Sequence, residues 1–193
     1  MERSDLWLVV LVACLVGPLA AGCSPAPEPE PETVTEVLLE GPYLGQEPPG
    51  AEAELFAPGI VSTGMAERDV AMTPDGAVLY FTRSVGPRMT VAAIMVVRRD
   101  EEGRWGEPEV APFSGRYFDL EPAVAPDGGR LLFVSTRPLP GEQAPSETEQ
   151  IWVMDRVGDG WGPPRPAGPP VNGPAAQFFP SLTADGTDRK SVV

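Results

Sequence analysis

Short apolar runs separated by turn residues fill the chain from residue 55 onward. Residues 78–81, 91–97, 131–134 and 151–154 are continuous apolar stretches rather than strict alternations of apolar and polar positions. Such runs are typical of strands that are covered on both faces of a sheet. The chain also holds 25 Pro and 21 Gly, which argue against a helical bundle because both residues break helices. The pattern therefore predicts an all-β domain of short strands.

The turn motif Pro-Asp-Gly recurs at intervals of about 50 residues. In it, Pro sets φ, Asp bonds to nearby backbone and Gly accepts a positive φ; the third copy has Ala in place of Pro. The predicted turn residues are Asp75, Gly76, Asp127, Gly128, Asp185 and Gly186. The first two copies run into an apolar strand, whereas the third meets a change of sequence at residue 188.

Each complete unit is predicted to hold four strands, in the first unit at residues 69–73, 78–83, 90–98 and 108–112. Four-stranded units of this length favour a β-propeller over a sandwich. The predicted fold is a partial β-propeller of about two four-stranded blades and the start of a third. The outer face of the first blade would then lack a neighbour, and its apolar strands are expected to be partly exposed.

A second motif, Trp-Gly-x-Pro, follows the central apolar run of each unit at Trp105 and Trp161. With Pro-Asp-Gly-x-x-Leu-Tyr/Leu-Phe, Ile-x-Val and Phe-Pro-Ser-Leu-Thr-x-Asp-Gly, it resembles the WD40-like repeat of the TolB-type propeller and of many bacterial lipoproteins. The resemblance covers residues 55–187. It implies a full propeller of six blades, sometimes seven, and equal roles for the two tryptophans in blade packing. Known roles of the family are protein docking, envelope organisation and gating of peptidases when the propeller is fused to a hydrolase domain.

The N-terminus looks like an export signal. Residues 6–21 form an apolar run that is too short for a membrane span of about 20 residues. The following Leu-Ala-Ala-Gly-Cys resembles the bacterial lipobox, which implies a signal peptide at 1–22 and a lipid on Cys23. An ordinary signal peptide or an uncleaved anchor are the alternatives. Residues 23–54, rich in Pro and Glu, are predicted to form a disordered tether.

The last residues depart from the repeat. Residues 188–193 stand where an apolar strand should follow the third turn, and they contain Lys190, the one lysine of the chain. We expect this tail to be non-native sequence, with natural truncation as the alternative. In either case the chain is expected to be a fragment of a longer protein.

Charge and composition exclude several functions. The net charge of −14 leaves no basic surface for nucleic acid, and the absence of His excludes histidine-based catalysis or metal ligation within this sequence. Glu107 with Glu109 and the 100–102 acidic run are expected to be solvated, and Asp119 with Glu121 is a weak candidate for a calcium site. We predict no catalytic residue, metal or cofactor.

The predicted function is that of an envelope lipoprotein, held by a lipid on Cys23, whose propeller binds envelope proteins or cell-wall glycan. Ser24 after the lipidated cysteine favours the outer membrane, facing the periplasm. Aromatic residues that precede the first strands of units are candidates for the binding surface, with core packing as the alternative: Tyr117, Phe118, Phe178 and Phe179. The alternative function is the propeller part of a peptidase or glycan hydrolase whose catalytic part is missing, so enzymatic activity is left open.

Overall fold

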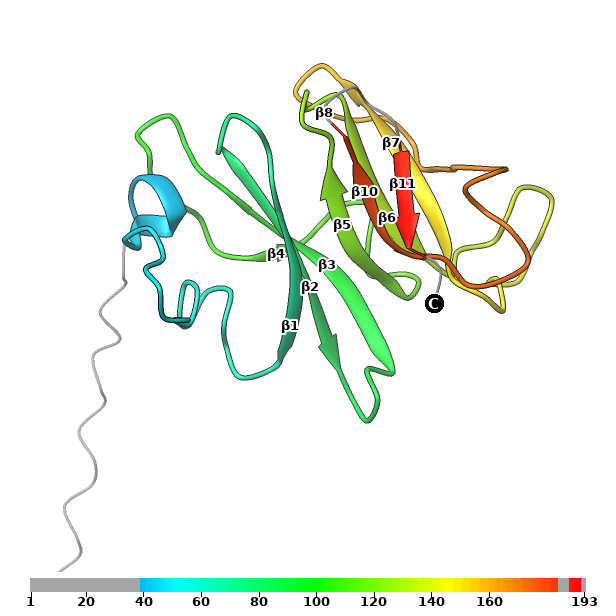
Figure 1. Cartoon of the computed structure of the whole chain (residues 1–193), viewed down its shortest axis with the longest axis horizontal. Helices are drawn as coiled ribbons and strands as arrows, with labels where there is room; N and C mark the ends of the chain where they lie inside the picture. The colour runs from blue at the N-terminus through cyan, green and yellow to red at the C-terminus, as the bar shows by residue number, and fades with distance from the viewer. Residues whose placement is uncertain (1–38, 184–187, 192–193) are drawn as a thin grey trace, which may run out of the picture. The chain divides into compact units, whose positions relative to one another are not determined.

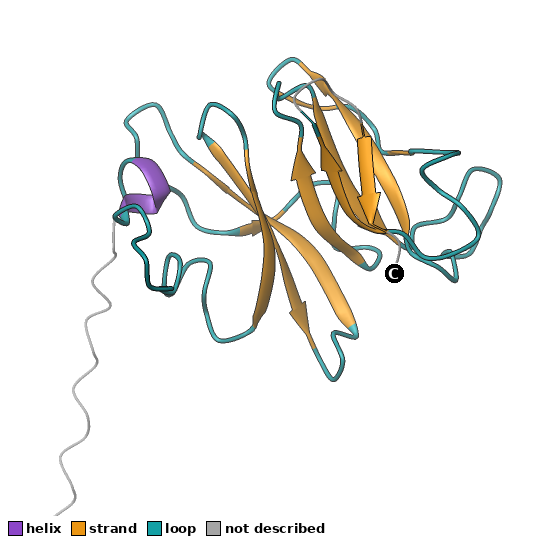
Figure 2. Cartoon of the chain, viewed as in Figure 1, coloured by secondary structure: helices purple, strands orange, loops and turns teal. Residues whose placement is uncertain are grey.

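The computed structural model describes residues 39–183 and 188–191 as β-strands, loops and one short 3₁₀ turn, η1 (Pro42–Gly45) (Figure 1). Two antiparallel sheets contain β1 to β9, and a further antiparallel pair follows them (Figure 2). The predicted all-β class is therefore confirmed. In the part of the chain that the structure describes, no helix has the length and apolar character needed to cross a bilayer.

The first sheet has the order β1-β2-β3-β4. Its strands are β1 (Ala66–Met72), β2 (Val78–Val85), β3 (Val91–Arg98) and β4 (Glu109–Val110), all close to their predicted positions. The β2–β3 ladder is regular over its whole length, from Val78↔Arg98 to Val85↔Val91. Continuous pairing of two apolar strands gives this sheet its rigid centre.

The second sheet has the order β5-β6-β7-β8, and β9 also pairs with β7. Its strands are β5 (Asp119–Val124), β6 (Arg130–Ser135), β7 (Gln150–Val157), β8 (Gly160–Trp161) and β9 (Arg165–Pro166). The two sheets make matching bonds outside their ladders. The N–H of Ile94 donates to Ser114 Oγ in the first sheet, and that of Ile151 donates to Asn172 Oδ1 in the second.

The last pair consists of β10 (Phe178–Leu182) and β11 (Asp188–Ser191). Strand β5 contacts both β1 and β10, so the first strands of successive units are neighbours (Figure 1). The predicted non-native tail overlaps β11. The pairing of β11 with β10 does not test whether this tail is native sequence, which stays a prediction.

Three apolar clusters fill the faces of the sheets. The cluster between the two sheets joins Tyr80, Ile94 and Val96 to Phe133, Trp152 and Met154, all buried. Alternate residues of β2 and β3, including Phe81 and Val97, form a second cluster on the other face of the first sheet. The third cluster covers the far face of the second sheet, where β10 packs. Burial on both faces explains why these strands are continuously apolar.

The expectation of a bare outer face on the first sheet is wrong. Leu44, Ala57 and Val61 are at most 4% exposed and pack on this face with Phe81 and Trp105. Within the predicted tether of residues 23–54 the structure describes residues 39–54, where Leu44 is buried in this cluster and Leu39 packs against it; the tether itself stays a prediction.

Candidate functional site

The turn aspartates are held within their own turns. Asp75 Oδ1 accepts bonds from Ala77 N at 3.0 Å and Thr73 Oγ1 at 2.6 Å, and these bonds lower the pKa of this carboxyl. Asp127 Oδ1 accepts a bond from Gly129 N at 2.8 Å. Gly76 and Gly128 have φ values of 65° and 71°, which favour glycine. Asp185 and Gly186 lie outside the described residues, as does Cys23.

The two Trp-Gly motifs make parallel contacts. The guanidinium of Arg99 lies 5.8 Å from the Trp105 ring centre, and that of Arg156 lies 5.3 Å from the Trp161 ring centre. Each indole N–H also donates a bond to the layer that covers its sheet, Trp105 to Gly41 O at 2.7 Å and Trp161 to Tyr80 Oη at 2.8 Å. The N-terminal segment thus covers one face of the first sheet, just as the first sheet covers one face of the second.

The structure divides the four candidate aromatics between the core and the surface. Phe118 and Phe178 pack at the edge of the cluster on the far face of the second sheet. Phe179 is 48% exposed, with the guanidinium of Arg68 5.6 Å from its ring centre. Tyr117 is half-buried and lies at a different place, in the loop before β5. Tyr117, Phe118 and Phe178 are thus all partly buried, and Phe118 lines the same hollow as Tyr117, whereas Phe179 is exposed.

Tyr117 lines a hollow of about 290 Å³ at the loop end of the sheets. The β2–β3 hairpin contributes Thr90 and Val91, the loop before β5 contributes Arg116, and the β6–β7 loop contributes Thr136 and Pro145. Backbone bonds tie these loops together, since Thr136 N donates to Phe118 O and Ser146 N donates to Thr136 O. The strands that these loops connect were predicted from the sequence, and they give the hollow a rigid base.

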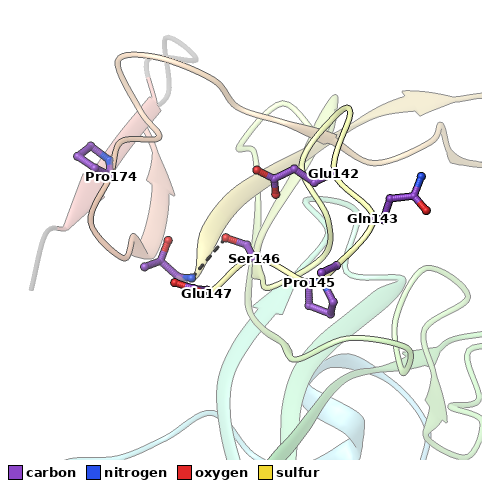
Figure 3. A pocket seen from close by; sticks show the side chains of 8 residues that line it. Glu142, Gln143, Pro145, Ser146, Glu147 and Pro174 are labelled. Atoms are coloured by element: carbon purple, nitrogen blue, oxygen red, sulfur yellow. Dashed lines mark hydrogen bonds between the residues drawn. The ribbon is translucent and has the colours of Figure 1, made fainter.

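A second hollow, of about 660 Å³, adjoins the first and shares Pro145 with it. Glu142, Gln143 and Glu147 line it from the β6–β7 loop, and Pro174 lies across from them on the connection to β10 (Figure 3). Ser146 Oγ accepts a bond from Thr148 N within the loop (Figure 3). Its polar lining and open loops contrast with the apolar interior of the sheets.

Arg137 anchors the base of this loop end. Its Nη2 donates to Asp119 Oδ1 at 2.9 Å and to Phe113 O at 3.0 Å, while its Nε donates to Ser135 Oγ at 3.0 Å. Asp119 is fully buried, and its other oxygen accepts a bond from Ser114 Oγ. Because the guanidinium neutralises Asp119, this carboxylate is not available to a cation. Among the described residues no cluster of Asp, Glu, Cys or His is arranged to hold a metal ion.

Arg116 is an exposed cation beside Tyr117, with its guanidinium carbon 5.4 Å from the ring centre. The guanidinium of Arg137 lies 5.7 Å from the same ring. Arg137 is paired with Asp119, whereas Arg116 makes no ion pair with a carboxylate of residues 39–183. Sequence reasoning missed Arg116, because its place beside the hollow depends on three loops that are distant along the chain.

The first strand of each unit bulges at one recurring position. Asp69, Glu121 and Phe179 occupy the same position before the turn aspartate, and all three have left-handed φ values between 52° and 57°. The strand register shifts at each of them. Left-handed backbone at a non-glycine residue is uncommon, and its recurrence at one repeat position was not visible in the sequence, because Glu121 and Phe179 are not residue types that favour it.

Glu121 links three units through this bulge. Its Oε1 accepts a bond from Arg68 Nη2 at 3.1 Å, and its Oε2 accepts one from Phe179 N. Its own N–H donates to Thr82 Oγ1 at 2.9 Å. Burial raises the pKa of Glu121, against the opposing effect of the bond from Phe179 N. Both carboxylate oxygens therefore accept bonds from neighbouring groups of the protein.

The other acidic residues weighed from the sequence are exposed. Glu109 pairs with Arg98 at the surface of the first sheet, and Glu107 is also exposed. Asp100 Oδ1 accepts a bond from Arg104 N within the β3–β4 turn, so the 100–102 run forms a solvated turn. The two adjoining hollows at the loop end are the candidate site for binding. No family model matches the chain, and no curated protein has significant sequence similarity to it.

Proposed function

We propose that the chain belongs to a lipid-anchored protein of the bacterial envelope whose sheets are blades of a β-propeller and whose loop end binds an envelope protein or cell-wall glycan. The lipobox-like sequence at Cys23 supports the anchor. Neighbouring first strands and face-to-face packing of the sheets support the propeller, because blades are arranged in this way around an axis.

The observation that carries the binding function is the pair of adjoining hollows around Tyr117 and Pro145. They are formed by loops, and one of these loops is the longer β6–β7 connection. Loops on a rigid scaffold are where binding residues concentrate, since they change without cost to the core.

The anchor is tested by expressing the full chain and Cys23→Ala in a bacterial host with radiolabelled palmitate. We expect label and membrane association for the native sequence, and an unlabelled protein released from membranes for the variant. The absence of label on the native sequence would contradict the anchor.

Binding is tested with the released Cys23→Ala chain on immobilised cell-wall sacculi and on purified envelope proteins. Tyr117→Ala in this background should weaken retention at least tenfold. Glu101→Ala is the matched control, because Glu101 is exposed in the turn at the other end of β3. Equal retention of all three proteins, or none, would contradict the proposed site.

A further inference from the structure

We propose that the hollow beside Arg116 and Tyr117 recognises a glycan bearing isolated carboxylate groups, with Arg116 as the residue that pairs with the carboxylate. The inference rests on the proposed function and specifies the ligand of the same site. It follows from the charges, hydroxyl groups and size of the hollow.

The charge of the hollow is opposite to that of the chain. The net charge is −14, yet no aspartate or glutamate lines this hollow. Arg88, in the β2–β3 hairpin that supplies Thr90, is a second exposed arginine without an ion pair in the described part of the chain. Two unpaired guanidinium groups at one loop end favour an anionic ligand, since a guanidinium pairs with a carboxylate through two parallel bonds.

Tyr117 keeps the Arg116 guanidinium in position. A cation over an aromatic face is stabilised without losing its N–H donors, which remain able to bond to a ligand. Arg137 reaches the same ring, but its charge is cancelled by Asp119. Arg116 therefore carries the unpaired positive charge of the hollow. Arg137 is fixed by its pairing with Asp119 and contacts Tyr117, the aromatic partner of Arg116.

Two hydroxyl groups complete the lining. Thr90 Oγ1 donates to Pro87 O at 2.6 Å and retains its capacity to accept a bond. Thr136 Oγ1 accepts a bond from Phe118 N at 3.3 Å and retains its proton for donation. An acceptor and a donor on two sides of a small hollow match a sugar hydroxyl, which both donates and accepts.

The adjoining hollow limits how much negative charge the ligand carries. Glu142 and Glu147 line it, and they would repel a continuous polyanion that extends past Pro145. A chain with carboxylates separated by neutral sugar rings avoids this repulsion. The volume of about 290 Å³ is at the small end of ligand sites, which also favours a sugar unit over a folded protein surface.

The test compares two disaccharides that differ chiefly in one carboxylate. N-acetylglucosaminyl-N-acetylmuramic acid, with its lactyl carboxylate free, and neutral N,N′-diacetylchitobiose are titrated calorimetrically into the Cys23→Ala chain. We expect the acidic disaccharide to bind at least tenfold more tightly, with the difference falling as salt is added. Triglutamate and inorganic phosphate, titrated in parallel, should bind at least tenfold more weakly than the acidic disaccharide.

Arg116→Gln should remove the preference for the acidic disaccharide while leaving the circular dichroism spectrum unchanged. Arg165→Gln is the matched control, because this exposed arginine pairs with Asp155 on the second sheet. Equal affinity for the two disaccharides, no binding at millimolar concentration, or a preference that survives Arg116→Gln would overturn the inference. Tighter binding of triglutamate or phosphate would overturn the choice of a glycan. Retention on sacculi or envelope proteins with any of these results would leave the proposed function standing.

Discussion

Trp105 offers a direct measurement of how strongly the N-terminal segment stabilises the first sheet. The side chain is 7% exposed and packs with Leu44 and Phe81. Its indole N–H also bonds to Gly41 O, so truncation removes both packing and a hydrogen bond. We expect Trp105→Ala to lower the free energy of unfolding by about 3–5 kcal/mol, the usual cost for a buried tryptophan.

Trp161 gives an internal comparison at the same repeat position. It is half-buried, with its N–H bonded to Tyr80 Oη. Equal effects were expected from the repeat alone, but the structure revises this expectation because less apolar surface is lost at Trp161. We expect Trp161→Ala to cost roughly half as much, since the hydrophobic contribution scales with the buried area.

Urea denaturation of the full chain, followed by far-ultraviolet circular dichroism, measures both losses. Trp105→Phe separates the hydrogen bond from the packing and should cost about 0.5–1.5 kcal/mol for the bond alone, plus the smaller ring. Limited proteolysis should then cleave residues 46–55 faster in Trp105→Ala than in Trp161→Ala. Equal destabilisation by the two alanine variants, or unchanged cleavage, would refute the packing of the segment against Trp105.

Two other predictions concern carboxylates. Asp127→Ala should lower the unfolding free energy by about 1 kcal/mol through loss of the bond from Gly129 N, measured in the same urea series; a neutral result would contradict its role in the turn. Burial raises the folded-state pKa of Glu121, so its contribution to stability is greatest below the unfolded pKa and falls as pH rises through the folded pKa. Unfolding free energies of wild type minus Glu121→Gln should therefore decrease over this pH range, and an increase would show that the pKa is lowered instead.

The turns and apolar strands were predictable because their causes are local. Pro-Asp-Gly fixes a turn through the bonding of Asp75 and Asp127 to residues two positions ahead, and continuous apolar runs mark strands buried on both faces. The covering segment was missed because its Pro and Glu content outweighed single apolar residues such as Leu44. Composition averages over a stretch, whereas burial depends on which side chain meets the sheet.

Only some residues of the proposed binding end could be named from the sequence. Tyr117 was a candidate because it precedes a first strand, but the hollow that it lines with Arg116 is formed by loops that meet only in the fold. The bulge residues were missed for a related reason. The left-handed backbone at Glu121 is stabilised by Thr82, Arg68 and Phe179, which come from three separate units and leave no local signal.

The bulge bonds give the units a fixed order. The N–H of the bulge residue in each following unit needs an acceptor from the unit before it, and Thr82 supplies this for Glu121. In the next unit Val134 stands at the position of Thr82, so the carboxylate of Glu121 accepts the bond from Phe179 N instead. That carboxylate in turn needs Arg68 of the first unit as its partner. An engineered chain in which the second unit is duplicated or moved to the front would leave a buried carboxylate without its arginine, so these units cannot be exchanged as equivalent modules.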